Sequence, residues 1–252
     1  DYCSFVPIVE SSMTIKFLRE YCLELKMPNL VSQRTVSPYL MLDFEPEDLP
    51  KKVKKGLRYD LKRGEIELDR LGLVEYTEIT DQQEAISELR LFFNMLDSRE
   101  EVTGRVGSEY ENTLRKNIFK DYLENDLMRE SVNFCRLTID KLPIAYHFGF
   151  EFNQKLLWYK PAFDLRYARF SVGKILIKKS IEHAIAKKYT EFDFLLGDEK
   201  YKYQWTNTSR KVFEISMANQ VYTSRFFYFL INSVRPRLKK LKTFLVNSIK
   251  KK

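Results

Sequence analysis

A turn and the helix that follows it offer the clearest chemistry in this chain of 252 residues. The turn Ser171-Val172-Gly173 precedes an amphipathic helix expected over residues 173–188. A helix that begins at a glycine-containing turn presents free backbone N–H groups and a positive dipole end to an anion. The sequence therefore predicts a phosphate-binding turn that comprises Arg169, Ser171, Val172, Gly173 and Lys174.

An acidic residue stands in the strand expected after this helix, over residues 191–196. About thirty residues suffice for a strand, a helix and a parallel strand to form one right-handed unit, which places the turn and Gly197 at one sheet edge, where ligands bind. Asp193 lies between two phenylalanines, and a carboxylate in an apolar strand must be paired or reach a polar cleft. Strict alternation would point Asp193 and Gly197 toward the same side. Pairing and catalysis are both open to Asp193.

Neither histidine has an obvious cysteine or serine partner, and the sequence lacks a Gly-x-Ser-x-Gly motif, so a covalent nucleophile is not indicated. His147 lies in an expected strand, where it could face the cleft as a base with a pKa near neutrality or pack as an ordinary strand residue. His183 shares helical spacing with Lys179 and Lys187. That spacing predicts a solvated position for His183.

Composition indicates a chain that is folded throughout. Apolar residues make up 44%, and Gly and Pro number only 8 each, so long flexible linkers are not expected. The three cysteines are widely spaced and form no Cys-x-x-Cys pair, which argues against a disulfide framework and a thiolate zinc site and favours a reducing cytoplasm. No apolar run approaches the length of a membrane-spanning helix, and no signal peptide is recognised.

The net charge of +8 is concentrated at one end of the sequence. Residues 235–252 hold eight basic and no acidic residues, so the rest of the chain carries 35 basic and 35 acidic residues. A neutral body disfavours nucleic acid as a partner. Leucines at helical spacing among these lysines predict a basic amphipathic helix. It could pack on the domain, or residues 226–252 could contact anionic lipid as a peripheral membrane anchor.

Patterning predicts an alternation of strands and helices along most of the chain. A helix over 11–26 and basic helices over 47–71 come first. The expected elements that follow are a strand at 73–79, helices at 81–96 and 109–128, strands at 131–139, 143–152 and 156–163, the helix at 173–188, the strand at 191–196, a short helix at 199–205 and a strand at 211–217.

This order, together with several short motifs, resembles the CelD-like or BioF2-like branch of the GNAT N-acyltransferases, known from proteins associated with bacterial polysaccharide synthesis and related to Fem-type peptidyl transferases. The resemblance covers roughly residues 36 to 218. The matching residues are Leu142-Pro143-Ile144-Ala145, Phe163-Asp164, Ser171-Val172-Gly173, Asp193-Phe194-Leu195-Leu196-Gly197, Tyr201-Lys202, Trp205, and the upstream helix from Lys54 to Leu71 followed by Gly72.

The resemblance implies an α/β GNAT fold with a mixed, mostly antiparallel sheet flanked by helices. It also implies transfer from acetyl-CoA or another acyl-CoA to an amine on a small molecule or glycan, without a metal and at a cytoplasmic location. Tyr201 matches the tyrosine that protonates the departing thiolate, with Asp193 and His147 as further catalytic candidates. The implied substrate-binding residues are Asp164, Gly197, Lys202 and Trp205.

The same resemblance divides the chain into three parts. Residues 1–35 would be the remnant of a preceding GNAT-like repeat, residues 36–222 the acyltransferase domain, and residues 223–252 a basic amphipathic tail.

Two alternative functions accompany this interpretation. One is an aminoacyl-tRNA-dependent Fem-like transferase, which the neutral body disfavours. The other is a non-catalytic GNAT-like scaffold of a polysaccharide synthesis system. The acyl-CoA loop departs from the general pattern Gln/Arg-x-x-Gly-x-Gly/Ala, because Ala168 stands at its first position and Ser171 at its first glycine.

Overall fold

A computed structural model describes residues 2–104 and 107–234. The chain forms two compact units, one made of residues 1–37 and 209–252 and the other of residues 38–208. The end of the acyltransferase domain at residue 222 stays a prediction. The predicted amphipathic helix over 235–252 lies outside the described residues, and the origin of residues 1–35 in a preceding repeat stays a prediction.

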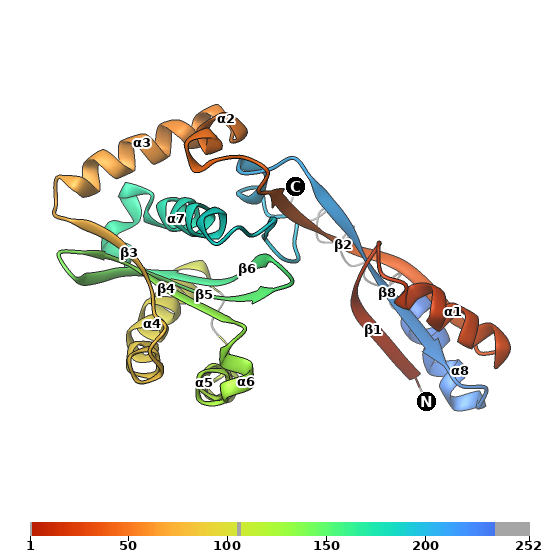
Figure 1. Ribbon diagram of the computed structural model, residues 1–252. Helices are drawn as coiled ribbons and strands as arrows, with labels where there is room; N and C mark the ends of the chain where they lie inside the picture. Colours follow the sequence, from red (N-terminus) through yellow and green to blue (C-terminus); the bar gives the residue numbers. More distant parts are fainter. Residues whose placement is uncertain (1, 105–106, 235–252) are drawn as a thin grey trace, which may run out of the picture. The chain divides into compact units, whose positions relative to one another are not determined.

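The larger unit is built on a mixed, mostly antiparallel sheet (Figure 1). Only β6 and β7 pair in parallel among the registers that the structure describes. The predicted α/β class is thereby confirmed. In spatial order, the strands are β2 (Asn29–Met41, through its last residues), β7 (Glu191–Asp193), β6 (Lys155–Phe163), β5 (Leu142–Phe152), β4 (Val132–Ile139) and β3 (Val74–Glu78).

Helices cover both faces of this sheet (Figure 1). α7 (Val172–Ala186) and α3 (Lys55–Asp69) lie on one face, where Leu57, Leu176 and Phe192 belong to a single core. On the other face lie α4 (Gln82–Thr103) and α5 (Glu109–Glu124), whose core is aromatic. The short helices are η1 (Pro46–Asp48), α2 (Leu49–Lys52) and α6 (Asp126–Arg129).

Local signals explain where several of these elements begin and end. The Asp81 side chain accepts the Glu84 N–H and caps α4 as predicted. However, α4 continues beyond the predicted end at residue 96 to Gly104, a left-handed residue with φ of 66°. α5 begins with a capping box at Ser108 and ends at Glu124, earlier than predicted. Asn125 caps α6, so the predicted helix over 109–128 is two helices.

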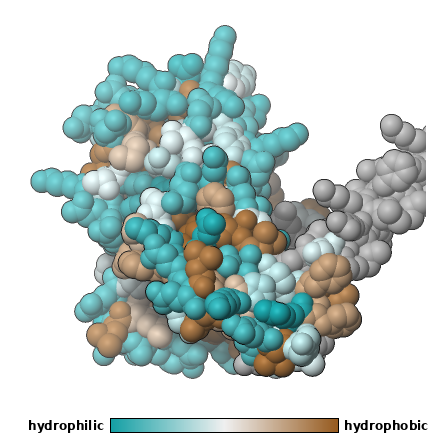
Figure 2. All heavy atoms as spheres, turned by 90° about the vertical axis from the view of Figure 1, so that its right-hand side faces the viewer, coloured by the Kyte–Doolittle hydropathy of each residue, from teal (hydrophilic) through white to brown (hydrophobic). Residues whose placement is uncertain are grey.

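The smaller unit contains β1 (Tyr2–Val9), α1 (Thr14–Glu24), the first part of β2, β8 (Ser209–Ala218), α8 (Tyr222–Phe229) and the π-helix η4 (Leu230–Val234). β1 pairs antiparallel with β8, and the sequence patterning missed β1. The small core comprises Ile8, Cys22, Ile215 and Met217. Figure 2 shows apolar side chains among polar ones on this unit's surface. Within 2–104 and 107–234, every helix is too short or too polar to cross a membrane.

Candidate active site

The parallel strands β6 and β7 part after a short register. They pair through three residue pairs, the last of which is Leu157 with Asp193. β6 continues to Phe163, whereas β7 ends at Asp193. The rest of β6 therefore runs on without β7 beside it. Ligands of open α/β sheets bind at carboxyl ends of strands where neighbours diverge, so this is the candidate active site.

The sequence prediction of a strand through residue 196 is wrong, because the chain turns directly after Asp193. One carboxylate oxygen of Asp193 accepts the N–H of Leu195 at 2.8 Å. Leu195 has a φ of 57° and Gly197 a φ of 121°, and both values are incompatible with a strand. Asp193 and Gly197 therefore do not share a side by alternation. Asp193 is 7% exposed, and its contact with Leu195 shapes the turn, while its catalytic role stays a prediction.

Lys202 holds this turn from inside. Its ammonium group donates to the carbonyl oxygens of Leu195 at 3.1 Å and Leu196 at 2.7 Å, and it lies 2.9 Å from Glu199 Oε2. An ammonium has three N–H donors, so these three acceptors match its capacity, and Lys202 is only 3% exposed. The contacts of the predicted substrate-binding lysine are therefore with the chain itself. Gly197 lies in the loop that Lys202 holds, and a Cβ there would collide with the Glu199 carboxylate.

Tyr201, the predicted proton donor, directly precedes Lys202. It is 39% exposed. Burial of its hydroxyl, helped by the Glu199 carboxylate, raises the pKa of Tyr201 to about 12, although Arg99 and Trp158 act in the opposite direction. Tyr201 is therefore protonated at neutral pH, as a general acid must be before it reacts.

His147 and Trp205, two other predicted site residues, lie in the core. His147 is 0% exposed and stacks on Trp158 with ring centroids 4.0 Å apart. Its Nε2 accepts the Tyr159 N–H at 3.2 Å, and burial lowers the pKa of His147 to about 3. These contacts describe the packed strand histidine that the sequence left open. Trp205 is 1% exposed and belongs to the core beside α7.

The predicted phosphate turn adopts the backbone of a glycine turn. A 3-10 segment, η2 (Leu165–Phe170), leads into Ser171, which has a φ of 59° and directly precedes α7. Val172 is buried and anchors the first turn of the helix. At Gly173 an added Cβ would lie 3.3 Å from the Phe163 ring. The Lys174 and Ile175 N–H groups donate to the Ser171 carbonyl oxygen at 2.8 and 3.1 Å, so the turn can offer an anion the N–H groups that precede them at the start of the helix.

Helix α3 supports the turn and the helix behind it. Gly64 packs so closely that a Cβ there would collide with the Phe170 carbonyl oxygen. Lys174 Nζ lies 2.6 Å from Asp60 Oδ2, and Lys178 pairs with Glu65 one turn on. Lys174, a predicted cofactor ligand, is thus an ion-pair partner of α3. Sequence reasoning missed Gly64 because a glycine within a helix shows no sign of its tertiary neighbour.

The remaining predicted residues sit around the turn with separate contacts. Asp164 caps η2 by accepting the Arg166 N–H at 2.9 Å, and the Arg166 side chain holds the pKa of Asp164 below its usual value. Arg169 is exposed, with its guanidinium 4.6 Å from the Phe170 ring centroid. Of the two flanking cations that the sequence nominated, Arg169 is the one presented to solvent.

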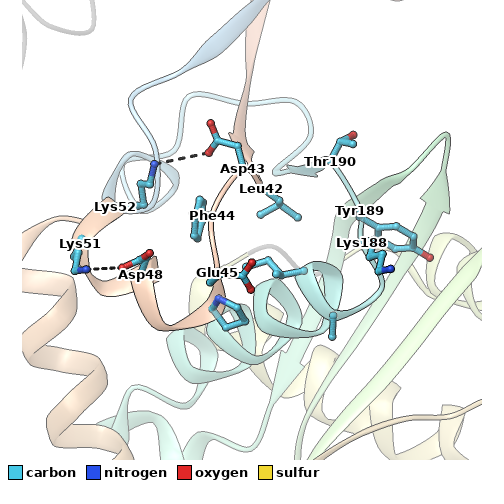
Figure 3. A pocket seen from close by; sticks show the side chains of 13 residues that line it. Leu42, Asp43, Phe44, Glu45, Asp48, Lys51, Lys52, Lys188, Tyr189 and Thr190 are labelled. Atoms are coloured by element: carbon cyan, nitrogen blue, oxygen red, sulfur yellow. Dashed lines mark hydrogen bonds and ion pairs between the residues drawn. The ribbon is translucent and has the colours of Figure 1, made fainter.

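A hollow of about 1020 Å³ lies at the C-terminal end of α7, away from the turn (Figure 3). Its walls are the segment 42–52 and the end of α7 with Lys188, Tyr189 and Thr190. Its charges are largely paired, with Lys51 2.5 Å from Asp48 and Lys52 3.7 Å from Asp43. A helix of this length separates its two ends by roughly 20 Å, so the hollow is not part of the site at the turn.

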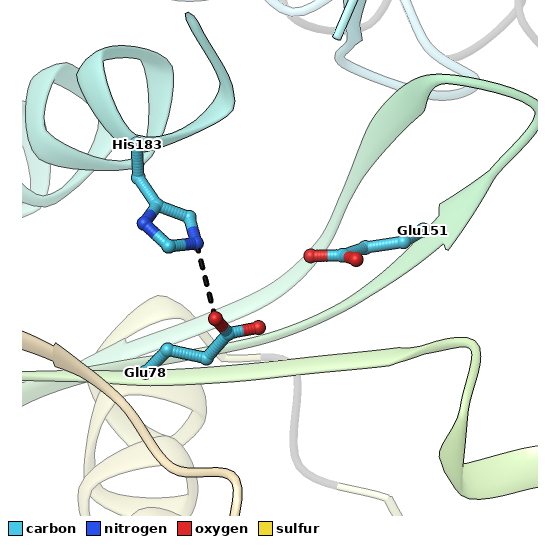
Figure 4. Close-up of side chains that lie close together, drawn as sticks. All are labelled: Glu78, Glu151 and His183. Atoms are coloured by element: carbon cyan, nitrogen blue, oxygen red, sulfur yellow. Dashed lines mark ion pairs between the residues drawn. The ribbon is translucent and has the colours of Figure 1, made fainter. Parts of the chain in front are cut away.

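A cluster of charged residues joins the last turns of α7 to the sheet (Figure 4). Ligand-type atoms of Glu78, Glu151 and His183 lie within 4.8 Å of one another. The Lys187 ammonium lies between the carboxylates, 2.8 Å from Glu78 and 3.0 Å from Glu151, so a lysine already balances their charge. The prediction that His183 is solvated is wrong, because its side chain is 21% exposed and lies 3.3 Å from Glu78.

Comparison with known proteins identifies the larger unit. Residues 55–203 match the model of the acetyltransferase (GNAT) domain. No curated protein sequence matches the chain.

Three solved structures are similar over most of this chain. A conserved protein of unknown function from Bacteroides thetaiotaomicron is 13% identical with a TM-score of 0.57, covering 81% of this chain and 66% of its own. FemX is 8% identical with a TM-score of 0.59, and the match covers 83% of this chain and 69% of FemX. The C-terminal domain of a putative lysylphosphatidylglycerol synthetase from Agrobacterium fabrum is 12% identical with a TM-score of 0.56, covering 85% and 67%. These likenesses concern the fold, and the chain spans about two thirds of each structure's length.

We expect Lys202→Met to destabilise the protein by about 1–3 kcal/mol, because the substitution leaves buried acceptors without their donor. Denaturant unfolding would measure the loss, and amide hydrogen exchange at Leu195 and Gly197 should become faster. Lys200→Met, at an exposed neighbouring position, should change neither. Unchanged stability together with lost substrate binding would instead show that Lys202 contacts the substrate.

Glu78→Gln should remove a pH-dependent part of the stability. The imidazole of His183, whose Nε2 lies 3.3 Å from the carboxylate, lowers the pKa of Glu78 together with Lys187 from 4.5 to about 2. Because folding favours the ionised carboxylate, its contribution is fully present above about pH 4.5 and is lost as the pH falls toward 2. As the pH falls through that window, the free energy of unfolding of the wild type should decrease more steeply than that of the variant. Glu75→Gln, at an exposed site on the same strand, is the control. Parallel wild-type and Glu78→Gln curves would contradict the assignment.

Proposed function

The chain belongs to the acetyltransferase (GNAT) domain family, and from this membership we propose that it is an N-acyltransferase of the CelD-like branch. The acyl group, most simply acetyl, would move from coenzyme A to an amine on a sugar or a lipid-linked glycan precursor, in bacterial polysaccharide or envelope biosynthesis. The observation that supports this most is the left-handed Ser171 turn at the start of α7, which η2 connects to β6, the strand that parts from β7.

The proposed donor site uses backbone groups more than side chains. The N–H groups at the start of α7 would bind the pyrophosphate of coenzyme A, with the exposed Arg169 adding charge. Lys174 would act indirectly, because its ammonium is paired with Asp60. The segment of β6 beyond Leu157 has no β7 residue opposite it, so its backbone groups could bind the amides of the donor arm.

The proposed reaction is a direct transfer. The acceptor amine would attack the thioester carbonyl, a C–N bond would form as the C–S bond breaks, and Tyr201 would give its proton to the departing thiolate. Of the two candidate bases, Asp193 is retained, because it lies at the end of β7. His147 is disfavoured by its complete burial and a pKa of about 3. The residues that would carry the acceptor are those around Gly197 and Asp164.

The proposed location is the cytoplasm, where acyl-CoA is available. A test of the function begins with isothermal titration of acetyl-CoA and free coenzyme A into the full chain and into a chain that ends at Ser233. Binding that survives the truncation supports the proposal and directs the search to amino-sugar acceptors. Absence of binding would contradict it. Aminoacyl-tRNA binding that persists without residues 235–252 would then identify the transferred group as aminoacyl, and failure of both donors would favour a scaffold.

Gly173→Asp should weaken acetyl-CoA binding at least roughly tenfold, because it places a carboxylate beside the proposed pyrophosphate position. Gly173→Ala is the matched control for steric effects, since its Cβ would meet only the Phe163 ring at 3.3 and 3.4 Å. Titration calorimetry on both variants separates charge from bulk. Equal acetyl-CoA affinity of Gly173→Asp and the wild type would refute the proposed turn.

Tyr201→Phe should lower kcat by roughly 100-fold, the usual range for loss of a general acid, and should leave acetyl-CoA affinity unchanged. Tyr203→Phe, two residues away, serves as the control. Steady-state kinetics with an identified acceptor would measure both. If Tyr203→Phe carries the loss instead, the proton donor is the neighbouring tyrosine, and if neither variant loses activity, a tyrosine donor is excluded.

A further inference from the structure

Helix α8 carries three aromatic side chains on one outward face. Tyr222, Phe226 and Phe229 follow one another at four and three residues, a spacing that places them on one side of an α-helix. Their exposed fractions are 89%, 60% and 56%. The opposite side faces β1 and β8, and Ser224 on that side is 8% exposed. α8 therefore joins its unit through one face, and the three exposed aromatic side chains lie on another.

The sequence from α8 onward carries charge of one sign. Glu214 is the last acidic residue of the sequence, and residues 215–252 contain nine basic residues and no acidic one. The other 34 basic residues are balanced by 35 acidic residues. One of the nine, Arg225, is an exposed residue of α8 itself, and the other eight follow in residues 235–252. The excess of positive over negative charge in the sequence is thus carried by residues 215–252, the segment that includes α8.

We propose that α8 docks on an anionic lipid surface. Tyr222, Phe226 and Phe229 insert between the headgroups and the acyl chains, and Arg225 on the same helix meets the lipid phosphates. Aromatic side chains are favoured at this interface, and basic residues are attracted to anionic leaflets within a Debye length. A protein partner would match the aromatic face equally well. However, the sequence from residue 215 onward contains basic and no acidic residues, and this favours a surface that is negative throughout, as an anionic membrane is.

The proposal does not depend on the acyl-transfer function, because lipid binding is measured without catalysis. The same unit also supplies a matched control. Phe17 and Tyr21 on α1 are 61% and 52% exposed and lie four residues apart, so they resemble the α8 residues in type and exposure. The charges of α1 cancel, because Lys16 and Arg19 are matched by Glu20 and Glu24, so α1 lacks the excess of positive charge that would attract it to anionic lipid.

The test is co-sedimentation of the full chain with vesicles of phosphatidylcholine alone or mixed with phosphatidylglycerol. The wild type should sediment with the mixed vesicles and remain in the supernatant with the neutral ones. The triple variant Tyr222→Ser, Phe226→Ser, Phe229→Ser should lose binding at least roughly tenfold, given the apolar area removed. The control variant Phe17→Ser, Tyr21→Ser should bind like the wild type, and both variants should keep the wild-type circular dichroism.

A second measurement covers the case in which the triple variant fails to fold. In Phe226→Trp, the new indole should shift its emission to shorter wavelength when anionic vesicles are added, because the two native tryptophans are 2% and 1% exposed and stay constant. No shift would overturn the proposal. It would also be overturned by equal binding to neutral vesicles, by unchanged binding of the folded triple variant, by tighter binding to an RNA oligonucleotide, or by self-association without lipid through the same three residues.

Discussion

The brevity of the parallel register between β6 and β7 is the constraint on which the site depends. Three residue pairs hold the two strands together, and the Asp193 carboxylate then turns the chain by accepting the Leu195 N–H. A strand that continued to residue 196 would have paired with β6 and covered its backbone groups. The buried Lys202 ammonium stabilises the turn that replaces this strand, because it donates to the Leu195 and Leu196 carbonyl oxygens that have no partner in the sheet.

Periodicity and turn chemistry predicted most of the larger unit, because those signals are local. The Asp81 cap and the strand at β3 follow from neighbouring residues alone. Contacts that depend on the folded path of the chain were not predictable in the same way. Lys202 looked like an anion ligand until its carbonyl partners were known, and His183 looked solvated because its partner Glu78 lies on β3. The early end of β7 depends on one side chain to backbone bond that alternation does not reveal.

The lysines of α7 hold the helix in place, which changes the expected chemistry of the turn. Lys174 and Lys178 pair with carboxylates of α3, and Lys187 pairs with Glu78 and Glu151 of the sheet. Each of these ion pairs occupies a lysine that the sequence alone would suggest as a phosphate ligand. An anion at the turn would therefore be bound by the backbone N–H groups and the helix dipole. The sequence predicted the turn from the residues that shape it, whereas the ion pairs that occupy its lysines became known only from the structure.

Ser171 illustrates how a departure from a family pattern can leave the geometry intact. Its φ of 59° lies in the left-handed region, which glycine enters freely. A residue with a Cβ adopts it at a cost of about 1–2 kcal/mol. The supporting contacts, among them the close packing of Gly64 against Phe170, must supply at least that much. The chain therefore maintains a glycine-type turn where it lacks the glycine. Among the residues that the structure describes, seven other non-glycine residues also have a positive φ, so the packing of the fold is sufficient to hold Ser171 in this conformation without a ligand.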